Sequence, residues 1–386
     1  MGSKEMKTGS IYSASDKALF DALTQHTVTQ SALRQLFLKR GIIVSHDTHR
    51  DVLAKYFSRL VHDYEDFQTL ARMFGSTNRR ERTASFRVLS TASLSNFESA
   101  AAAVVEQISE NGDSATVNRM EDGSIKIIVR YKKFHFEKNE FKQVVSKEAV
   151  ISIEQDKGAI VIRGPQNGDV DDWCRSIISN VESQLPDAIQ IDEISLENYN
   201  DPKVRSSFFD QLIKGISGYK KHDVTDVYVF HPKGQVEKDG DGDGDGDDVG
   251  GGGATGAIAV GSLGVHISRA SLKGEGVLDS DEFVALMHRG FYISKIVWQA
   301  KNNTVDSDIY EFEAQFSEPE TCTKFSYLPR GFYKYTGNQE YSKSRAQFTN
   351  EEDRELNIKI EIAARAVLLD IEKSTQLVTD NAQVKS

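Results

Sequence analysis

Apolar positions recur with the period of a helix near the start of the chain, within residues 27–61. Thr29 is suited to cap the first set, which consists of Leu33, Leu36 and Phe37. Gly41 ends the predicted helix, because glycine readily takes the left-handed conformation that closes a helix. The β-branched residues 42–44 are too few for another helix, so they predict a short extended link.

A second helix is predicted to begin where Thr48 is followed three residues later by Asp51, a spacing close to that of a capping box. Its predicted apolar stripe consists of Val52, Leu53, Tyr56, Phe57 and Leu60. The two helices and their link predict a helical head at residues 14–78, preceded by a disordered segment at 1–13.

Between residues 83 and 232, the spacing of apolar residues changes repeatedly between that of a strand and that of a helix. Alternating apolar residues predict hairpins within 115–131 and 149–164, each turning at a glycine, and helical spacing predicts helices at 94–108 and from Asp169. Hairpins mixed with helices are typical of an α+β module, with mixed or antiparallel strands and helices packed on one face.

The repeated Asp and Gly of residues 233–256 predict a flexible acidic linker, because this composition cannot bury apolar area. A second α+β module is predicted at 257–374. It has a helix at 279–288 and closes with a long helix from 349 to 374. Residues 375–386 are predicted to be a disordered tail. The fold class expected is therefore α+β, with a helical head followed by two modules.

The order of leucine-rich helix, Arg40-Gly41, apolar link, Val44-Ser45, Thr48 and second helix resembles the SAP motif, a helix-extension-helix DNA-binding unit. The resemblance covers residues 27–61 only and implies contact between basic residues near the link and DNA phosphates. The chain departs from the family pattern at Asp47, where the family has glycine, and at Arg50, which lies one place later.

Charge is distributed unevenly along the chain. Residues 1–92 contain 14 lysines and arginines against nine acidic residues, whereas the whole chain has a net charge of −11. Cationic clusters supply most of the sequence-independent affinity of proteins for nucleic acid. The residues predicted to contact nucleic acid, with duplex DNA the preferred ligand, are Arg34, Lys39, Arg40, His49, Arg50, Lys55, Arg79, Arg80 and Arg82.

The composition predicts a cytoplasmic protein without a membrane anchor, since no apolar run of 18 residues and no signal-peptide core occurs. Cys174 and Cys322 fall in different predicted modules, so we expect both to be reduced and partly buried. No cofactor, metal-ligand or catalytic motif is recognisable. Alternating aspartates at 239–243 match the first half of an EF-hand loop but lack its closing glutamate, which favours the linker interpretation.

One acidic pattern admits an enzymatic interpretation. Asp306 and Asp308 precede a strand carrying Glu313 and Gln315, a spacing loosely like that of metal-dependent nucleases. The competing interpretation is an ordinary half-exposed strand, in which Phe312 and the other apolar residues face the core while the acidic residues face solvent.

Three functions follow from these patterns. The first is non-enzymatic nucleic-acid binding by the head. The second is a sensor or adaptor that recognises a protein partner within an assembly, because the layout looks similar to uncharacterised bacterial proteins of antiviral defence. The third is a divergent metal-dependent nuclease. We take nucleic-acid binding as the first hypothesis and expect no catalytic residue.

Overall fold

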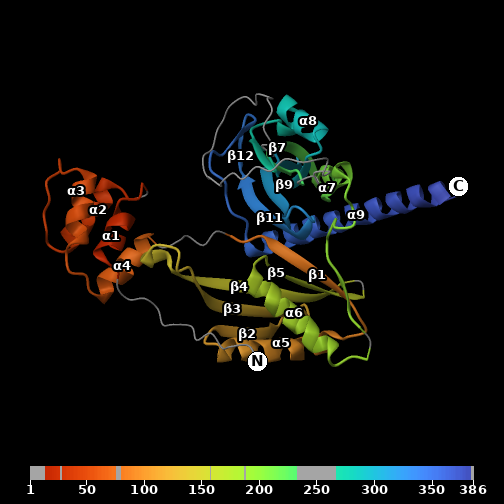
Figure 1. Ribbon diagram of the computed structural model, residues 1–386, viewed down its shortest axis with the longest axis horizontal. Coiled ribbons are helices and arrows are strands. Elements are labelled where there is room, and N and C mark those ends of the chain that lie inside the picture. The colour runs from red at the N-terminus through yellow and green to blue at the C-terminus, as the bar shows by residue number, and fades with distance from the viewer. Residues whose placement is uncertain are drawn as a thin grey trace, which may run out of the picture. The chain divides into compact units, whose positions relative to one another are not determined.

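The computed structural model describes residues 14–26, 28–74, 80–156, 158–186, 188–232 and 267–383, with side chains as far as 375. The chain divides into two compact units. The first comprises Met1–Arg82 and Phe86–Asp192, and the second comprises Thr83–Ser85 and Glu193–Ser386. Both units combine helices with antiparallel strands, so the predicted α+β class is confirmed (Figure 1). The predicted segments 1–13 and 233–256 lie outside the described residues.

The head consists of four short helices: α1 Asp16–Leu23, α2 Gln30–Lys39, α3 Arg50–Ser58 and α4 Tyr64–Phe74 (Figure 1). As predicted, Thr29 caps α2 by accepting a hydrogen bond from the amide of Ala32 at 3.1 Å, and Gly41 has φ 71°. The start of α3 differs from the prediction. Its capping residue is His49, whose Nδ1 accepts from the amide of Asp51 at 3.4 Å.

The head shares its core with a turn of the module that follows it. Phe141, in the short helix η1 Glu140–Lys142, stacks on Phe67 with ring centroids 5.2 Å apart and meets Phe74 edge-on at 5.4 Å. The side-chain amide of Asn139 also donates to the carbonyl of Ala18 at 3.0 Å. Removing the head would expose the ring of Phe141, so the function of the head is best tested in the full chain.

The rest of the first unit is a sheet with two covering helices. Its strands run in the order β2-β3-β4-β5-β1, β6 pairs with β1, and the pairings among β2 to β5 are antiparallel. Apolar residues of α5 and α6 form one buried cluster with the strands. The bounds are β1 Thr83–Leu89, α5 Leu94–Glu110, β2 Ser114–Arg119, β3 Ile125–Phe134, β4 Val144–Asp156, β5 Ala159–Pro165, α6 Gly168–Glu182 and β6 Gln190–Asp192.

Cys174 of α6 lies in this core, and its burial makes unfolding depend on pH. Burial raises the pKa of the thiol to about 12 from an ordinary 9.0. The unfolded chain therefore loses the proton first, and the free energy of unfolding is expected to fall by about 1.4 kcal/mol for each pH unit above about 9. Urea unfolding of the native chain and of Cys174→Ala between about pH 8 and pH 10.5 measures this contribution as their difference. An equal loss of stability in both proteins would contradict it.

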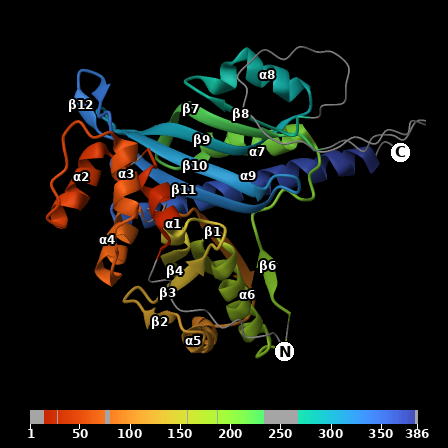
Figure 2. The same cartoon turned by 60° about the vertical axis from the view of Figure 1, so that its left-hand side comes forward.

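The second unit is a five-stranded antiparallel arrangement in the order β11-β10-β9-β7-β8. Helices α7 and α9 cover one face, where their apolar residues join those of the strands in one cluster (Figure 2). The bounds are α7 Pro202–Gly215, β7 Tyr219–Phe230, β8 Arg269–Lys273, η2 Val277–Asp279, α8 Asp281–His288, β9 Tyr292–Asn302, β10 Ile309–Glu318, β11 Thr323–Tyr333, β12 Tyr335–Gly337, β13 Glu340–Tyr341 and α9 Asn350–Gln383.

The acidic tract does not coincide with the division between the compact units, which lies after Asp192. Strand β7, before the tract, pairs antiparallel with β8, after it, so both belong to the second unit. Sequence composition marks a segment that cannot pack, but it does not indicate whether the flanking strands pair with each other.

Two helix boundaries also differ from those predicted. Ser280, rather than Asp279, caps α8 by accepting from the amide of Phe283 at 3.2 Å. The closing helix α9 begins near the predicted residue but continues past Ser374 to Gln383. Over the described ranges of the chain, none of the helices has both the length and the apolarity needed to cross a bilayer.

Candidate functional site

Arg50, predicted to face phosphate, is directed into the head. Its Nε donates to the carbonyl of Val28 at 2.8 Å, and its terminal nitrogen donates to the carbonyls of Leu23 at 3.3 Å and of Gln25. These carbonyls lie at and just beyond the end of α1, where a helix leaves acceptors unpaired. The guanidinium therefore joins the start of α3 to the end of α1.

We expect Arg50→Ala to destabilise the head by about 2 kcal/mol, because charged hydrogen bonds to carbonyls are lost while those carbonyls stay half-buried. Urea unfolding followed by circular dichroism measures the effect. Lys39→Ala is the matched control, since Lys39 is exposed and a surface truncation changes stability by no more than about 0.5 kcal/mol. Equal stability of the two variants would show that Arg50 does not hold the helices together.

Arg40 makes a similar internal network at the other end of α3. It forms an ion pair with Asp66, donates to the carbonyl of Val61 at 2.7 Å and to Nδ1 of His62 at 2.8 Å, and lies over the ring of Phe57 at 5.1 Å. Burial lowers the pKa of His62 from its ordinary 6.5, and the charge of Arg40 lowers it further, although a hydrogen bond to the Phe57 carbonyl opposes both. A neutral imidazole accepts from Arg40, so the network fixes the turn after α3.

The remaining predicted residues occupy varied positions. Arg34 is half-buried and donates to the carbonyl of His46 within the link. His49 is exposed, but it caps α3 and lies 3.6 Å from the carboxylate of Asp51. Lys39 and Lys55 are exposed, Arg80 is exposed, Arg82 is half-buried, and Arg79 lies outside the described residues.

Helix α3 presents a cationic and aromatic surface, of which the predicted binding residues included only Lys55. Val52, Lys55, Tyr56 and Arg59 are all exposed and follow the spacing i, i+3, i+4, i+7, which defines one side of a helix; we call them the α3 outer face. The predicted apolar stripe included Val52 and Tyr56, yet they are 41% and 59% exposed. Leu53 and Phe57 of the predicted stripe are buried, together with Ala54.

The end of α2, the link and the turn after α3 expose apolar residues as well. Ile43 and Val61 are each 90% exposed, and Leu38 is 63% exposed. The hydrogen bond from Arg40 to the carbonyl of Val61 places the start of the link beside this turn. We call Leu38, Ile43 and Val61 the link-turn patch. Such a concentration of exposed apolar side chains in a small head is a feature of interaction surfaces.

The acidic residues considered for a nuclease have other partners. Glu313 and Glu311 of β10 are 6% and 5% exposed, so the strand is covered on both faces and the predicted solvent face is wrong at these two positions. Lys295 lies 2.8 Å from Glu313, and Arg330 lies 3.2 Å from Glu311 and 3.6 Å from Glu313. Arg345 completes the network by pairing with Glu311.

The two aspartates do not join this network. Asp308 accepts from the amide of Tyr335 at 2.7 Å, whereas Asp306 is exposed in the preceding turn. Within the described part of the chain, no group of three or more His, Cys, Asp or Glu side chains is arranged to hold a metal ion. The geometry therefore gives the nuclease hypothesis no support, because magnesium chemistry requires converging carboxylates.

No protein-family model matches the chain, and no curated protein is significantly similar to it in sequence.

Proposed function

We propose that the protein binds nucleic acid, with duplex DNA as the preferred form, through the α3 outer face of its head. The observation that carries this proposal is the exposure of Lys55, Tyr56 and Arg59 on one side of α3. Lysine and arginine neutralise phosphates and release their counterions, and a tyrosine adds both a hydrogen bond and a flat ring.

The internal arginines support this role indirectly. Arg40 and Arg50 fix both ends of α3 through backbone carbonyls, so the outer face is held in one orientation before a ligand arrives. A helix about 10–12 Å across matches the major groove of DNA, which is about 12 Å wide. Preorganisation reduces the entropy lost on binding.

The charge pattern along α3 indicates which end meets the phosphates. Asp47 and Asp51 are exposed near its start, while Lys55 and Arg59 lie toward its end. Like charges repel at close range, so the C-terminal half of the helix is the part that approaches the backbone. Lys39, which is exposed at the end of α2, adds a further cation to the head.

Fluorescence anisotropy of labelled DNA with the full chain tests this function. Duplex is expected to bind at physiological salt with a Kd within the range of non-specific binding, roughly 1–100 µM, and more tightly than single-stranded DNA of the same length. Absence of binding to both forms near roughly 100 µM would exclude nucleic acid as the ligand of the head.

Recognition of a protein partner is the second candidate, and the link-turn patch favours it. Ile43 and Val61 are too exposed to contribute to the stability of the head, and apolar side chains at this exposure are typical of the centre of a protein interface. In this alternative, Ile43→Ser with Val61→Ser abolishes co-purification of a partner, whereas reversing the charges of Lys55 and Arg59 does not. If the charge reversal abolishes binding and the two serine substitutions do not, nucleic acid is favoured as the ligand.

A further inference from the structure

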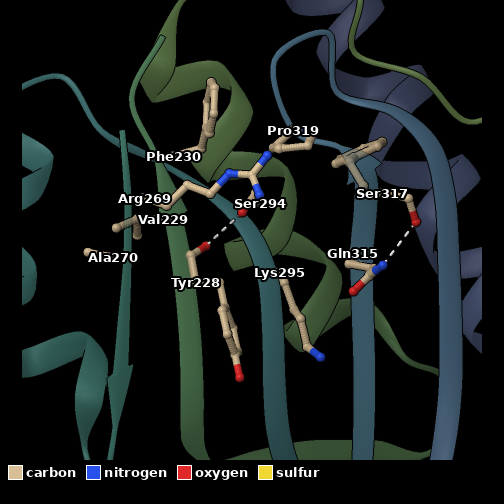
Figure 3. A pocket seen from close by; sticks show the side chains of 11 residues that line it. Tyr228, Val229, Phe230, Arg269, Ala270, Ser294, Lys295, Gln315, Ser317 and Pro319 are labelled. Atoms are coloured by element: carbon tan, nitrogen blue, oxygen red, sulfur yellow. Dashed lines mark hydrogen bonds between the residues drawn. The ribbon is translucent and has the colours of Figure 1, made fainter. Parts of the chain in front are cut away.

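Figure 3 shows a small cavity at one end of the sheet in the second unit, lined mainly by residues of β7, β8, β9 and β10. Its volume is about 180 Å³. In its lining, the ammonium of Lys295 lies 2.8 Å from the carboxylate of Glu313, and the amide of Gln315 donates to the hydroxyl of Ser317 at 2.9 Å. These polar groups are bonded within the protein, so the cavity itself does not indicate a ligand.

An exposed aromatic pair lies in the first unit, where β3 leads into β4; we call residues 131–143 the β3–β4 segment. The backbone amide of Lys138 donates to the carbonyl of His135 at 3.0 Å, which closes a four-residue turn. The amide of His135 donates to the carbonyl of Gln143 at 2.7 Å, and the side chain of Gln143 donates to the carbonyl of Lys138 at 3.0 Å. Phe136, the second residue of the turn, is therefore held at its tip.

The ring of Phe136 is oriented by a neighbouring ring. It lies nearly parallel to the ring of Phe134, with ring centroids 5.9 Å apart and an angle of 17° between the rings. This geometry is typical of offset stacking. Phe136 is nevertheless 67% exposed. The pair thus presents a flat apolar surface in one orientation, with most of the Phe136 side chain open to water.

The charges around this pair suit an anionic ligand. The β3–β4 segment contains four lysines against two glutamates, whereas the chain as a whole has a net charge of −11. Both glutamates have partners within the protein. Glu137 lies 3.2 Å from Nδ1 of His135, and Glu140 accepts from the amide and the hydroxyl of Ser15 at 2.7 and 3.2 Å. Lys138, at the end of the turn, is exposed.

The β3–β4 segment is bonded to the head that carries the α3 outer face, and both belong to one compact unit. Besides the aromatic contacts described above, the ammonium of Lys142 donates to the side chain of Gln25 at 2.9 Å. The backbone carbonyl of Gln25 accepts from Arg50, the first residue of α3. Phe136 is six residues from Lys142, a separation of at most about 21 Å. This is less than one turn of B-DNA, which is about 34 Å long, so one DNA molecule can contact both surfaces.

We propose that the exposed ring of Phe136 stacks on an unpaired base of a DNA molecule whose duplex part is held by the α3 outer face. The proposal rests on the function proposed above and specifies the ligand as a duplex with a single-stranded extension. Bases inside a duplex already stack on their neighbours, so an unpaired base is the one that can offer its face to the ring. Every base has such a face, so the site accepts any sequence. Lys138 neutralises a phosphate of the same strand.

Fluorescence anisotropy of the full chain with three labelled DNA molecules tests the stacking site. All three share one duplex: the first is blunt, the second carries a single-stranded extension of ordinary nucleotides, and the third carries an extension of abasic nucleotides. The two extensions contain the same number of phosphates, so their comparison isolates the bases. We expect the native chain to bind the ordinary extension roughly tenfold more tightly than the abasic one, which is the effect of stacking one base.

Substitutions assign this difference to the ring. Phe136→Ala is expected to abolish the difference between the two extensions, whereas Phe136→Tyr, which retains a ring, is expected to preserve it. Lys138→Gln is expected to weaken binding of both extensions by the same factor, because their phosphates are equal in number. Met120→Ala is the matched control, since Met120 is an apolar residue in the turn between β2 and β3 and is 43% exposed. This control is expected to bind all three DNA molecules as the native chain does.

Equal binding of the ordinary and abasic extensions by the native chain, or a difference that persists in Phe136→Ala, would overturn the proposal. The blunt duplex distinguishes this failure from failure of the proposed function. If the blunt duplex does not bind while the difference between the extensions still depends on Phe136, the stacking site is retained and duplex binding by the head is contradicted. Absence of binding to all three DNA molecules would contradict both.

Discussion

Reversing two charges on the α3 outer face, Lys55→Glu with Arg59→Glu, is expected to weaken binding of duplex DNA by roughly 100-fold at low salt. Each substitution removes a contact to phosphate and adds a repulsion in its place. Both side chains are exposed, so the fold of the head is retained. Anisotropy titrations, with circular dichroism to verify folding, measure the change.

The matched control is Lys203→Glu with Lys343→Glu, which changes the net charge of the chain by the same amount. Both of these lysines are exposed on the second unit. If binding depends on the α3 outer face, this control weakens DNA binding only a few-fold, through the change in the long-range electrostatic potential of the protein. Equal losses in the two double variants would mean that overall charge, and not the face, determines affinity.

Arg205→Ala is expected to destabilise the second unit by about 3–5 kcal/mol, because several hydrogen bonds from one buried, charged donor are lost together. Arg205 is 4% exposed. Its guanidinium donates to the carbonyl of Tyr199 at 2.6 Å, to the hydroxyl of Tyr292 at 2.7 Å and to the carbonyl of Glu320 at 2.9 Å. Truncation leaves the buried Tyr292 hydroxyl and the two part-buried carbonyls without their donor, and it also removes a guanidinium that packs on the Tyr292 ring.

Urea unfolding with a probe in the second unit, such as the fluorescence of the buried Trp298, measures this loss. Arg289→Ala is the control, because Arg289 is exposed just after α8 and its truncation is expected to change stability by less than about 0.5 kcal/mol. Arg205→Lys tests whether the shape of the guanidinium matters. The single ammonium of lysine cannot reach the three acceptors that the planar guanidinium reaches, so this variant is also expected to be destabilised. A loss below about 1 kcal/mol for Arg205→Ala would contradict the assigned role.

Local sequence signals predicted most elements, because caps, turns and periodicity act within a few residues. Asp201 followed by Pro202 is a start signal that the sequence alone displays, and α7 begins there. The hairpin predicted within 115–131 turns at Gly123, a glycine with positive φ. In the closing helix, Leu356, Ile360 and Val367 follow helical spacing in the sequence, and all three are buried. These features follow from backbone chemistry and do not require knowledge of the partner element.

The features that the sequence did not predict depend on tertiary packing. Glu311 and Glu313 alternate with core residues, as in a half-exposed strand. They are nevertheless buried, because cations from other parts of the sequence pair with them. Adjacent positions on a helix differ by about 100°, so Val52 and Leu53 could not be assigned to opposite sides before the packing of α3 was known. For the same reason a count of basic residues could not separate Arg50, which bonds inside the head, from Lys55, which faces outward.

The salt dependence of duplex binding is the most direct test of nucleic-acid binding by the head. The slope of log K against log salt counts the phosphates that the protein neutralises, at roughly 0.9 per contact. We predict that replacing Lys39, Lys55 and Arg59 with glutamine reduces the magnitude of the slope by roughly 2–3. A native chain that does not bind duplex, or a slope that is the same in the triple variant, would contradict the proposed function.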